Sequence, residues 1–240
     1  MSEPRRYPSD LSDARWELVQ PVLTAWRAER RGRGLDIARP PDHDLRILLD
    51  AVLYVNRTSI PWRYLPHDYP PWPTVYAYFA HWQEEGVFDQ LNTLLRRQVR
   101  QREGRETEPS ACVIDSQSIK TSTNVPTAGQ GTDAGKKIVG RPTVCKTWVD
   151  GGYRQHLVEH AATLGIDMHI VRRNPTTRGF TVLPRRWTVE RTLGWLMQHR
   201  RLARDYEAKP HRSEAIIHLA MINLMTRRLT GESTPTWRGT

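Results

Sequence analysis

Three acidic residues in the second half of the 240-residue chain have the types and positions that metal-dependent chemistry requires. Asp115 follows the apolar run Ala111 to Ile114, and Asp150 follows the apolar run Val144 to Val149. Both runs are typical of buried strands, and the ligands of open α/β sheets gather where strands end. Glu190 lies in a segment with helical spacing, among several arginines. A single aspartate after a strand is more often a turn former or a helix cap, but the set of three favours a shared site.

Carboxylate oxygens are the protein ligands that Mg²⁺ prefers. Two such ions about 4 Å apart can activate a water or a 3′-hydroxyl on one side and stabilise the leaving oxygen on the other. The sequence therefore predicts that Asp115, Asp150 and Glu190 are both the catalytic residues and the metal ligands. Arg186 lies one helical turn before Glu190, so the two side chains can project to the same side. The simpler alternative for this pair is a surface ion pair.

The composition favours a polyanionic partner. Lys and Arg total 36 against 26 Asp and Glu, which gives a formal charge of +10, and arginine suits phosphate because its planar group can bond two oxygens. The residues expected to contact nucleic acid are Lys136, Lys137, Arg185, Arg186, Arg191, Arg200 and Arg201. No apolar run approaches the roughly 18 residues of a membrane span, and no signal peptide is present, so we expect a cytoplasmic protein without a membrane partner.

Residues 1–104 are expected to form a helical, helix-turn-helix-like DNA-binding domain. Apolar residues recur with helical spacing after Ser12, over 45–56, over 75–82, and from 88 to about 104. Residues 27–42 are basic and rich in glycine and proline, which predicts a loop or arm that either contacts phosphate or serves as a solvated linker.

The helical spacing ends near residue 104 and a polar segment follows, which predicts a second, mixed α/β domain over 105–230. The expected strands are 111–114, 144–149 and 168–171, and the expected helices are 155–164, 187–202 and 213–229. Residues 116–142 are polar and contain several glycines, which predicts a long loop. The tail over 231–240 is expected to be disordered.

Four motifs in this order resemble those of insertion-sequence transposases in the group named after insertion sequence five, within the insertion-sequence-four-like transposases. They are Val-Ile-Asp115-Ser-Gln-Ser, the segment from Asp133 to Arg141, Trp-Val-Asp150-Gly-Gly-Tyr, and the segment from Val182 to Leu196 that contains Glu190. The stretch from Leu11 to Phe79 is similar to the helical domain that precedes catalysis in that group. The resemblance covers nearly the whole chain.

This resemblance implies a DDE transposase, which carries out DNA transposition as part of a bacterial mobile element. It implies a ribonuclease-H-like catalytic domain, two Mg²⁺ or Mn²⁺ ions held by Asp115, Asp150 and Glu190, and Arg186 as the arginine of the signature around the glutamate. The implied partners are double-stranded DNA, as terminal inverted repeats and target, and a second copy of the chain on that DNA. Location at the bacterial nucleoid follows from the same resemblance.

One spacing departs from the family pattern. Only 35 residues lead from Asp115 to Asp150, whereas a complete ribonuclease-H-like domain places two further strands and a helix there. An internal deletion of the second and third strands is the simplest account, and it predicts a catalytic site that is weak or inactive. The alternatives to an active transposase are a truncated copy that only binds DNA and a decayed copy that folds poorly.

Overall fold

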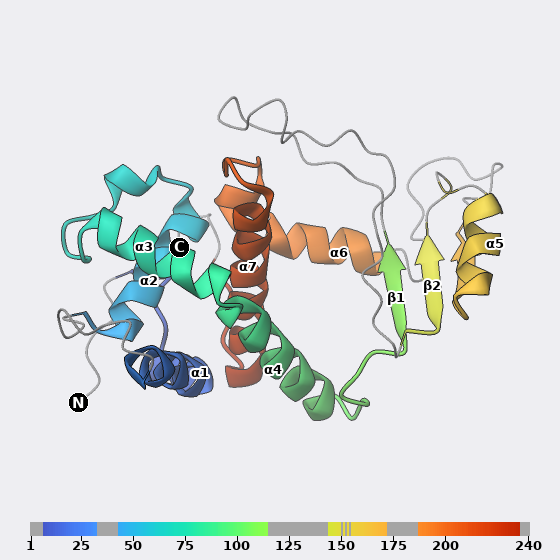
Figure 1. Ribbon diagram of the computed structural model, residues 1–240, viewed down its shortest axis with the longest axis horizontal. Coiled ribbons are helices and arrows are strands. Elements are labelled where there is room, and N and C mark those ends of the chain that lie inside the picture. The colour runs from blue at the N-terminus through green and yellow to red at the C-terminus, as the bar shows by residue number, and fades with distance from the viewer. Residues whose placement is uncertain are drawn as a thin grey trace.

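The computed structural model describes residues 7–32, 43–114, 144–149, 151, 153, 155–171 and 187–235. Figure 1 shows a large helical body and a small α/β part, with the short helix α6 (Trp187–Leu196) lying between them. Four helices lie in the described part of the N-terminal half, namely α1 (Asp13–Gly32), α2 (Leu45–Thr58), α3 (Trp72–Glu84) and α4 (Val87–Arg102). A 3₁₀ turn, η1 (Trp62–Tyr64), lies between α2 and α3. The helical character predicted for residues 1–104 is confirmed for the described part of this range.

The ends of these helices follow local chemistry. The Ser12 hydroxyl accepts the backbone N–H of Arg15 at the start of α1, and the Asp44 carboxylate accepts that of Arg46 at 2.8 Å at the start of α2. Gly86 has φ +71°, which allows the sharp change of direction between α3 and α4.

The basic segment after Trp26 differs from its prediction. Residues 27–32 continue α1 as helix instead of forming an arm. Arg30 forms an ion pair with Glu85, and Arg27 donates to the His43 carbonyl at 3.0 Å. These two arginines therefore hold α1 to neighbouring elements. Residues 33–42 lie outside the described residues.

The last helix, α7 (Pro210–Thr230), belongs to the helical body. Its buried side chains Ile216, Leu219 and Ile222 pack in the same core as the buried residues of α1 to α4. Figure 1 shows α7 standing directly against α4. The sequence pattern places this helix in the α/β domain, so the predicted boundary at residue 105 separates segments that fold together. The helical body is built from both ends of the chain.

The start of the tail also differs from its prediction. Gly231 ends α7 with φ +75°, and its N–H donates to the Arg227 carbonyl. Arg227 donates to the Ser233 carbonyl at 2.9 Å, and Arg57 donates to that of Pro235. Residues 231–235 are thus fastened to the body, and residues 236–240 lie outside the described residues.

Among the residues that the structure describes, the α/β part contains three parallel strands in the order β1 (Ala111–Ile114), β2 (Lys146–Val149) and β3 (Asp167–Ile170). Helix α5 (Gln155–Thr163) connects β2 to β3 and packs on the sheet through Ala161. This is the mixed α/β class that the sequence predicts, and it is consistent with a ribonuclease-H-like domain that lacks its second and third strands. The strands that precede Asp115 and Asp150 are neighbours in this sheet.

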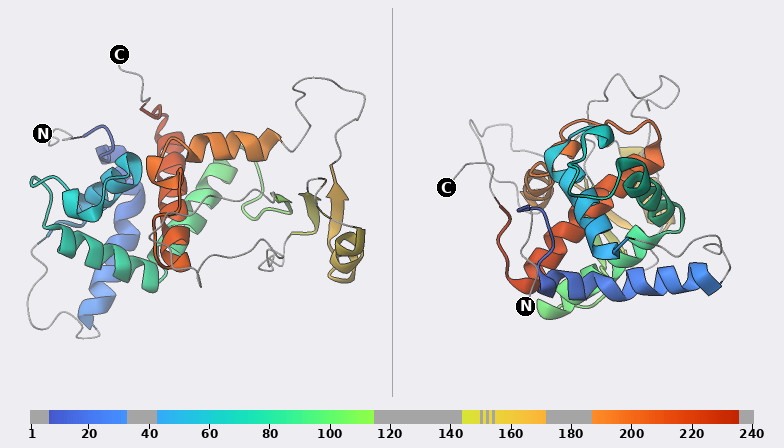
Figure 2. Two further views of the ribbon diagram at one scale, coloured as in Figure 1. Left: turned by 90° about the horizontal axis from the view of Figure 1, so that it is seen from above. Right: turned by 90° about the vertical axis from the view of Figure 1, so that its left-hand side faces the viewer.

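Helix α6 (Trp187–Leu196) joins the two parts, and the 3₁₀ turn η3 (Arg200–Leu202) follows it. One end of α6 contacts β1, and the other end contacts α7. Figure 2 (left) shows α6 running from α7 towards the strands. No helix in the described ranges is both long and apolar enough to cross a membrane.

Candidate active site and DNA-binding surface

The first two acids follow neighbouring strand ends. In the parallel register of β1 and β2, Ile114 is the partner of Val149. Each is the last described residue before one of the predicted acids, Asp115 and Asp150, which themselves lie outside the described residues. The register therefore brings the two strands to the same sheet edge at equivalent positions, which is what a pair of ligands after these strands would require.

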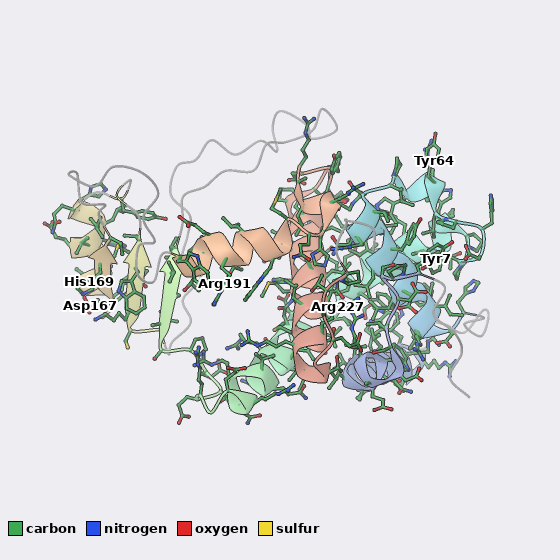
Figure 3. All side chains as sticks on the ribbon, turned by 180° about the vertical axis from the view of Figure 1, so that it is seen from behind. Tyr7, Tyr64, Asp167, His169, Arg191 and Arg227 are labelled. Carbon is green, nitrogen blue, oxygen red and sulfur yellow. The ribbon has the colours of Figure 1, made fainter. Side chains whose placement is uncertain are left out.

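The third predicted acid lies at the end of α6 that is nearer the sheet. Glu190 is exposed in the first turn of α6. Figure 3 labels the next residue, Arg191, at the end of α6 beside β1. A carboxylate in the first turn is favoured by the helix dipole, which alone can account for a glutamate there. Glu190 also lies on the end of α6 beside β1, the strand that leads to Asp115, and a shared site requires this position.

The described residues do not by themselves complete a metal site. Within the described ranges, no group of three or more His, Cys, Asp or Glu side chains could hold a metal ion. Of the predicted ligands, only Glu190 falls within these ranges. Its hard carboxylate oxygens suit Mg²⁺ or Mn²⁺, so the donor chemistry fits the implied metal.

Arg191 is held on the exposed surface of α6 between two indole rings. Its guanidinium carbon lies 4.7 Å from the ring centroid of Trp187 and 4.8 Å from that of Trp195. These rings are 42% and 37% exposed, so the guanidinium is oriented but still faces solvent. Arg200 is exposed as well. The other predicted DNA contacts, Lys136, Lys137, Arg185 and Arg186, lie outside the described residues.

Arg201 is buried, whereas the predicted contact with DNA requires a position on the surface. It is 6% exposed, and its Nε donates to Glu207 Oε1 at 2.7 Å. A second nitrogen donates to the Ile60 carbonyl at 3.0 Å, and the guanidinium lies 5.5 Å from the Trp62 ring centroid. The side chain ties η3 to the segment before η1, so its burial argues against a DNA contact.

Other arginines also serve the fold, which the sequence reasoning missed. Arg15, Arg57, Arg212 and Arg227 are all buried in the helical body. Arg212, for example, donates to the Ala80 carbonyl and to Glu84, which fastens the start of α7 to α3. Arg15 gives the clearest sequence signal, because it precedes the buried Val19 and Leu23 at intervals of four residues. These buried arginines are therefore not available to DNA.

The segment after α6 is anchored in the helical body. His199 is fully buried, and its Nε2 pairs with the Asn223 side chain at 2.8 Å. Arg57 donates to the Gln198 carbonyl. Burial lowers the pKa of His199 to about 4, and the positive charge of Arg57 acts in the same direction. The ring is therefore neutral at pH 7, and the helix that carries Glu190 is fixed to the body at its far end.

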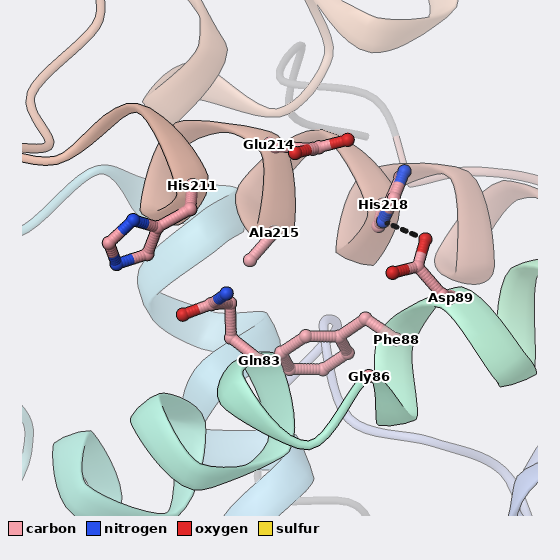
Figure 4. A pocket seen from close by; sticks show the side chains of 8 residues that line it. All are labelled: Gln83, Gly86, Phe88, Asp89, His211, Glu214, Ala215 and His218. Atoms are coloured by element: carbon pink, nitrogen blue, oxygen red, sulfur yellow. Dashed lines mark ion pairs between the residues drawn. The ribbon is translucent and has the colours of Figure 1, made fainter. Parts of the chain in front are cut away.

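A small hollow beside α7 contains the residue types of a metal site without its geometry. Figure 4 shows His211, Glu214 and His218 on α7 facing α3 and α4, with His218 Nδ1 3.3 Å from Asp89 Oδ1. The hollow has a volume of about 30 Å³, which is on the scale of one water molecule. These side chains do not form a metal-binding group among the described residues.

Comparison with protein families gives two matches in chain order. Residues 11–92 match the transposase of IS4/5 family (DUF4096), and residues 147–227 match the transposase DDE domain. Together they cover about two thirds of the chain, and residues 93–146, which include β1 and Asp115, fall between them. A search of curated proteins and a search of solved structures each returned no match.

Proposed function

Because the chain belongs to the DDE transposases of the IS4/5 type, we propose that it binds the terminal inverted repeats of a mobile element and cleaves and transfers DNA strands there. We propose Asp115, Asp150 and Glu190 as the catalytic acids and metal ligands. Double-stranded DNA is then the substrate, and Mg²⁺ or Mn²⁺ the cofactor. A pair of chains on two DNA ends, near the nucleoid, is part of the same proposal.

The observation that supports this most directly is the alignment of two strand ends with one helix end. Ile114 and Val149 are register partners, so the two strands end at the same edge of the sheet. Helix α6 contacts β1 and carries Glu190 in its first turn. Three carboxylates from these positions could converge, although they are far apart in the sequence.

Divalent metal bound by these acids would polarise the scissile phosphate and generate the attacking oxygen. The chain's own contribution is to position the DNA. Arg191, oriented by Trp187 and Trp195, faces solvent next to Glu190 and can hold a phosphate there. We propose Arg200, Lys136, Lys137, Arg185 and Arg186 as further phosphate contacts, and we leave out Arg201.

A specific observation favours a second candidate, a protein that binds end DNA without cleaving it. The described sheet has three strands of four residues each, and its buried apolar core consists of Val149, Ala161 and Met168. Such a small core gives little rigidity to the strands that lead to Asp115 and Asp150. The helical body has a far larger core and does not depend on this sheet.

The two candidates are separated by one assay on the full chain. Binding to the element's own end DNA is measured first, and strand cleavage is then measured with Mg²⁺ or Mn²⁺. Asp115→Asn is compared with Asp167→Asn, which alters a carboxylate of the same sheet. Asp167 begins β3 and pairs with Lys146 at 2.8 Å (Figure 3), at the opposite end of the strands from Ile114 and Val149.

Cleavage that Asp115→Asn abolishes and Asp167→Asn retains would support the transposase proposal. Binding without cleavage would support the second candidate. Absence of binding to end DNA by a folded chain would contradict both.

A further inference from the structure

Helix α6 depends on its two ends for its position. None of its ten residues is buried, so its own packing does not fix its direction. At one end it contacts β1, and at the other it leads into a segment whose side chains His199 and Leu202 are buried in the helical body. The carboxyl end of α6 is therefore where the helical body can set the direction of this helix.

Arg57, in the last turn of α2, caps this carboxyl end. Its side chain is buried, and its Nη1 donates to the Gln198 carbonyl. The Gln198 N–H in turn donates to the Trp195 carbonyl at 3.2 Å, so Gln198 continues the last turn of α6. The carbonyls at the end of a helix have no partner within the helix, and the helix dipole favours a cation beside them. Arg57 supplies both the donor and the charge.

The tail segment, residues 231–235, holds Arg57 from another side. Nη2 of Arg57 donates to the Pro235 carbonyl. Two residues earlier in the chain, the Ser233 carbonyl accepts a hydrogen bond from Arg227 at 2.9 Å, and Glu232 forms an ion pair with Arg227 at 3.5 Å. One short stretch of chain thus supplies acceptors to two buried arginines, of which Figure 3 labels Arg227 on α7.

The surrounding charges make Arg57 depend on its acceptors. Burial lowers the pKa of Arg57 to about 10, and the positive charges of Arg227 and Arg200 act in the same direction. A buried cation among other cations is costly unless oxygen atoms accept its hydrogen bonds. Removal of the Pro235 carbonyl takes away one of these acceptors, which favours movement of the guanidinium towards solvent and away from Gln198.

We propose that Arg57 is a positioning residue for Glu190 and that the tail segment holds Arg57 in this role. The proposal rests on the proposed function, because it concerns the geometry of the candidate site. Glu190 lies eight residues before Gln198, which corresponds to about 12 Å along a helix. A catalytic group must be held to within about 0.5 Å, so over this length α6 must keep its direction to within about 2°. The contacts at Gln198 act on that direction.

The test measures amide hydrogen exchange in α6 by mass spectrometry. The affinity for the element's end DNA and the rate of cleavage at saturating DNA with Mg²⁺ are measured in parallel. The variants are Arg57→Gln and Arg57→Lys. The control is Arg212→Gln, which alters another buried arginine whose contacts with the Ala80 carbonyl and Glu84 join α7 to α3.

Two shortened chains test the tail segment without altering any side chain of the helices, and they keep the proposal testable if Arg57→Gln does not fold. One chain ends at Ser233, so it lacks the Pro235 carbonyl but keeps the carbonyl that Arg227 binds. The other ends at Trp237 and keeps both carbonyls.

Arg57→Gln should speed exchange in α6 by roughly tenfold, the effect of one lost hydrogen bond to a charged group, and leave exchange in α1 and α5 unchanged. Arg57→Lys should restore part of the protection, because its ammonium group can serve one of the two carbonyls. The chain that ends at Ser233 should behave like Arg57→Gln, and the chain that ends at Trp237 like the unchanged chain. Cleavage should slow in step with the exchange in α6, with little change in DNA affinity, whereas Arg212→Gln should leave exchange in α6 unaltered.

Unaltered exchange in α6 of the folded Arg57→Gln chain would overturn the role of Arg57. So would an equal rise throughout the helical body in Arg57→Gln and Arg212→Gln, because it would assign Arg57 to stability alone. Faster exchange in α6 with an unaltered cleavage rate would overturn the link to Glu190, and normal exchange in the chain that ends at Ser233 would overturn the role of the tail segment. If the unchanged chain does not cleave DNA, the proposed cleavage fails, while exchange in α6 still decides whether Arg57 and the tail segment hold this helix.

Discussion

Lowering the pH from 7 to 5 is expected to destabilise the packing of His199 between η3 and α7. The ring is fully buried, pairs with Asn223, and lies near the positive charges of Arg57 and Arg227. Its pKa is lowered to about 4 in the folded protein, whereas the unfolded chain has the ordinary value of about 6.5. Between these values the unfolded chain binds more protons than the folded one. The stabilisation from His199 is therefore complete above pH 6.5 and is lost as the pH falls towards 4.

The magnitude follows from the two pKa values. At pH 5 the histidine is almost fully protonated in the unfolded chain and almost fully neutral in the folded protein. The difference reduces the free energy of unfolding by about 2 kcal/mol relative to pH 7. In a chain of this size such a change moves the urea midpoint by about 1 M or less, since the slope is at least a few kcal/mol per molar.

A pH titration of the unchanged chain alone would hide this effect. Asp50 is buried, accepts the backbone N–H of Leu11 at 2.8 Å, and has its pKa raised to about 7, chiefly by burial. A raised carboxyl pKa stabilises the folded protein as the pH falls through 7, which is opposite in sign to the effect of His199. The measurement must therefore compare the unchanged chain with His199→Gln, whose amide can still reach Asn223 but does not titrate.

Urea unfolding followed by circular dichroism at pH 7 and pH 5 gives the comparison. The difference in unfolding free energy between the two proteins should shrink by about 2 kcal/mol on going to pH 5. Parallel behaviour of the two proteins over this range would refute the reasoning, because it would mean that the buried ring does not resist protonation. The absolute stability of His199→Gln does not enter this test.

Three further outcomes are expected. Asp50→Asn should raise the free energy of unfolding, measured by urea unfolding, by about 4 kcal/mol at pH 8 and change it little near pH 4. The reason is that burial destabilises only the ionised form of the Asp50 carboxyl group. Leu219→Ala should destabilise the helical body by about 2–5 kcal/mol. A fragment of residues 1–104, which lacks α7, should show no cooperative thermal unfolding. A stable fragment would contradict the role of α7 as part of the core of the helical body. Arg191→Ala should lower the slope of log affinity for DNA against log salt by about one, whereas an unchanged slope, as expected for Arg31→Ala, would remove Arg191 from the DNA surface.

The order and type of the secondary structure could be predicted from the sequence because each element carries its own pattern. The apolar spacing of α2 and α4 identifies a helix without reference to its neighbours, and the short apolar run of β1 identifies a strand. The partner of α7 could not be predicted in this way. Its amphipathic pattern shows that a face is buried but not against which element, so the sequence could not show that α7 packs with α1 to α4.

The candidate site shows the same division. The pattern of an acid after an apolar run points to two strand ends, and the register of Ile114 with Val149 confirms that these strands are neighbours. Sequence could not distinguish arginines that face solvent from those that hold the fold together. Arg201 and Arg191 occur in equally basic surroundings, yet one is closed in by Glu207 and the Ile60 carbonyl while the other lies between exposed indoles. That difference depends on contacts between elements distant in the sequence.

The placement of α7 in the core of the helical body has a consequence for synthesis of the protein. Chains grow from the N-terminus at about 5–20 residues per second, so α1 to α4 leave the ribosome well before α7 is made. Until α7 is made, the apolar side chains of α1 to α4 that pack against it stay exposed, and the core of the helical body is incomplete. A chain that stops anywhere before residue 210 lacks this helix altogether. Such truncated products are expected to be substrates for proteases and not competitors for the element's ends.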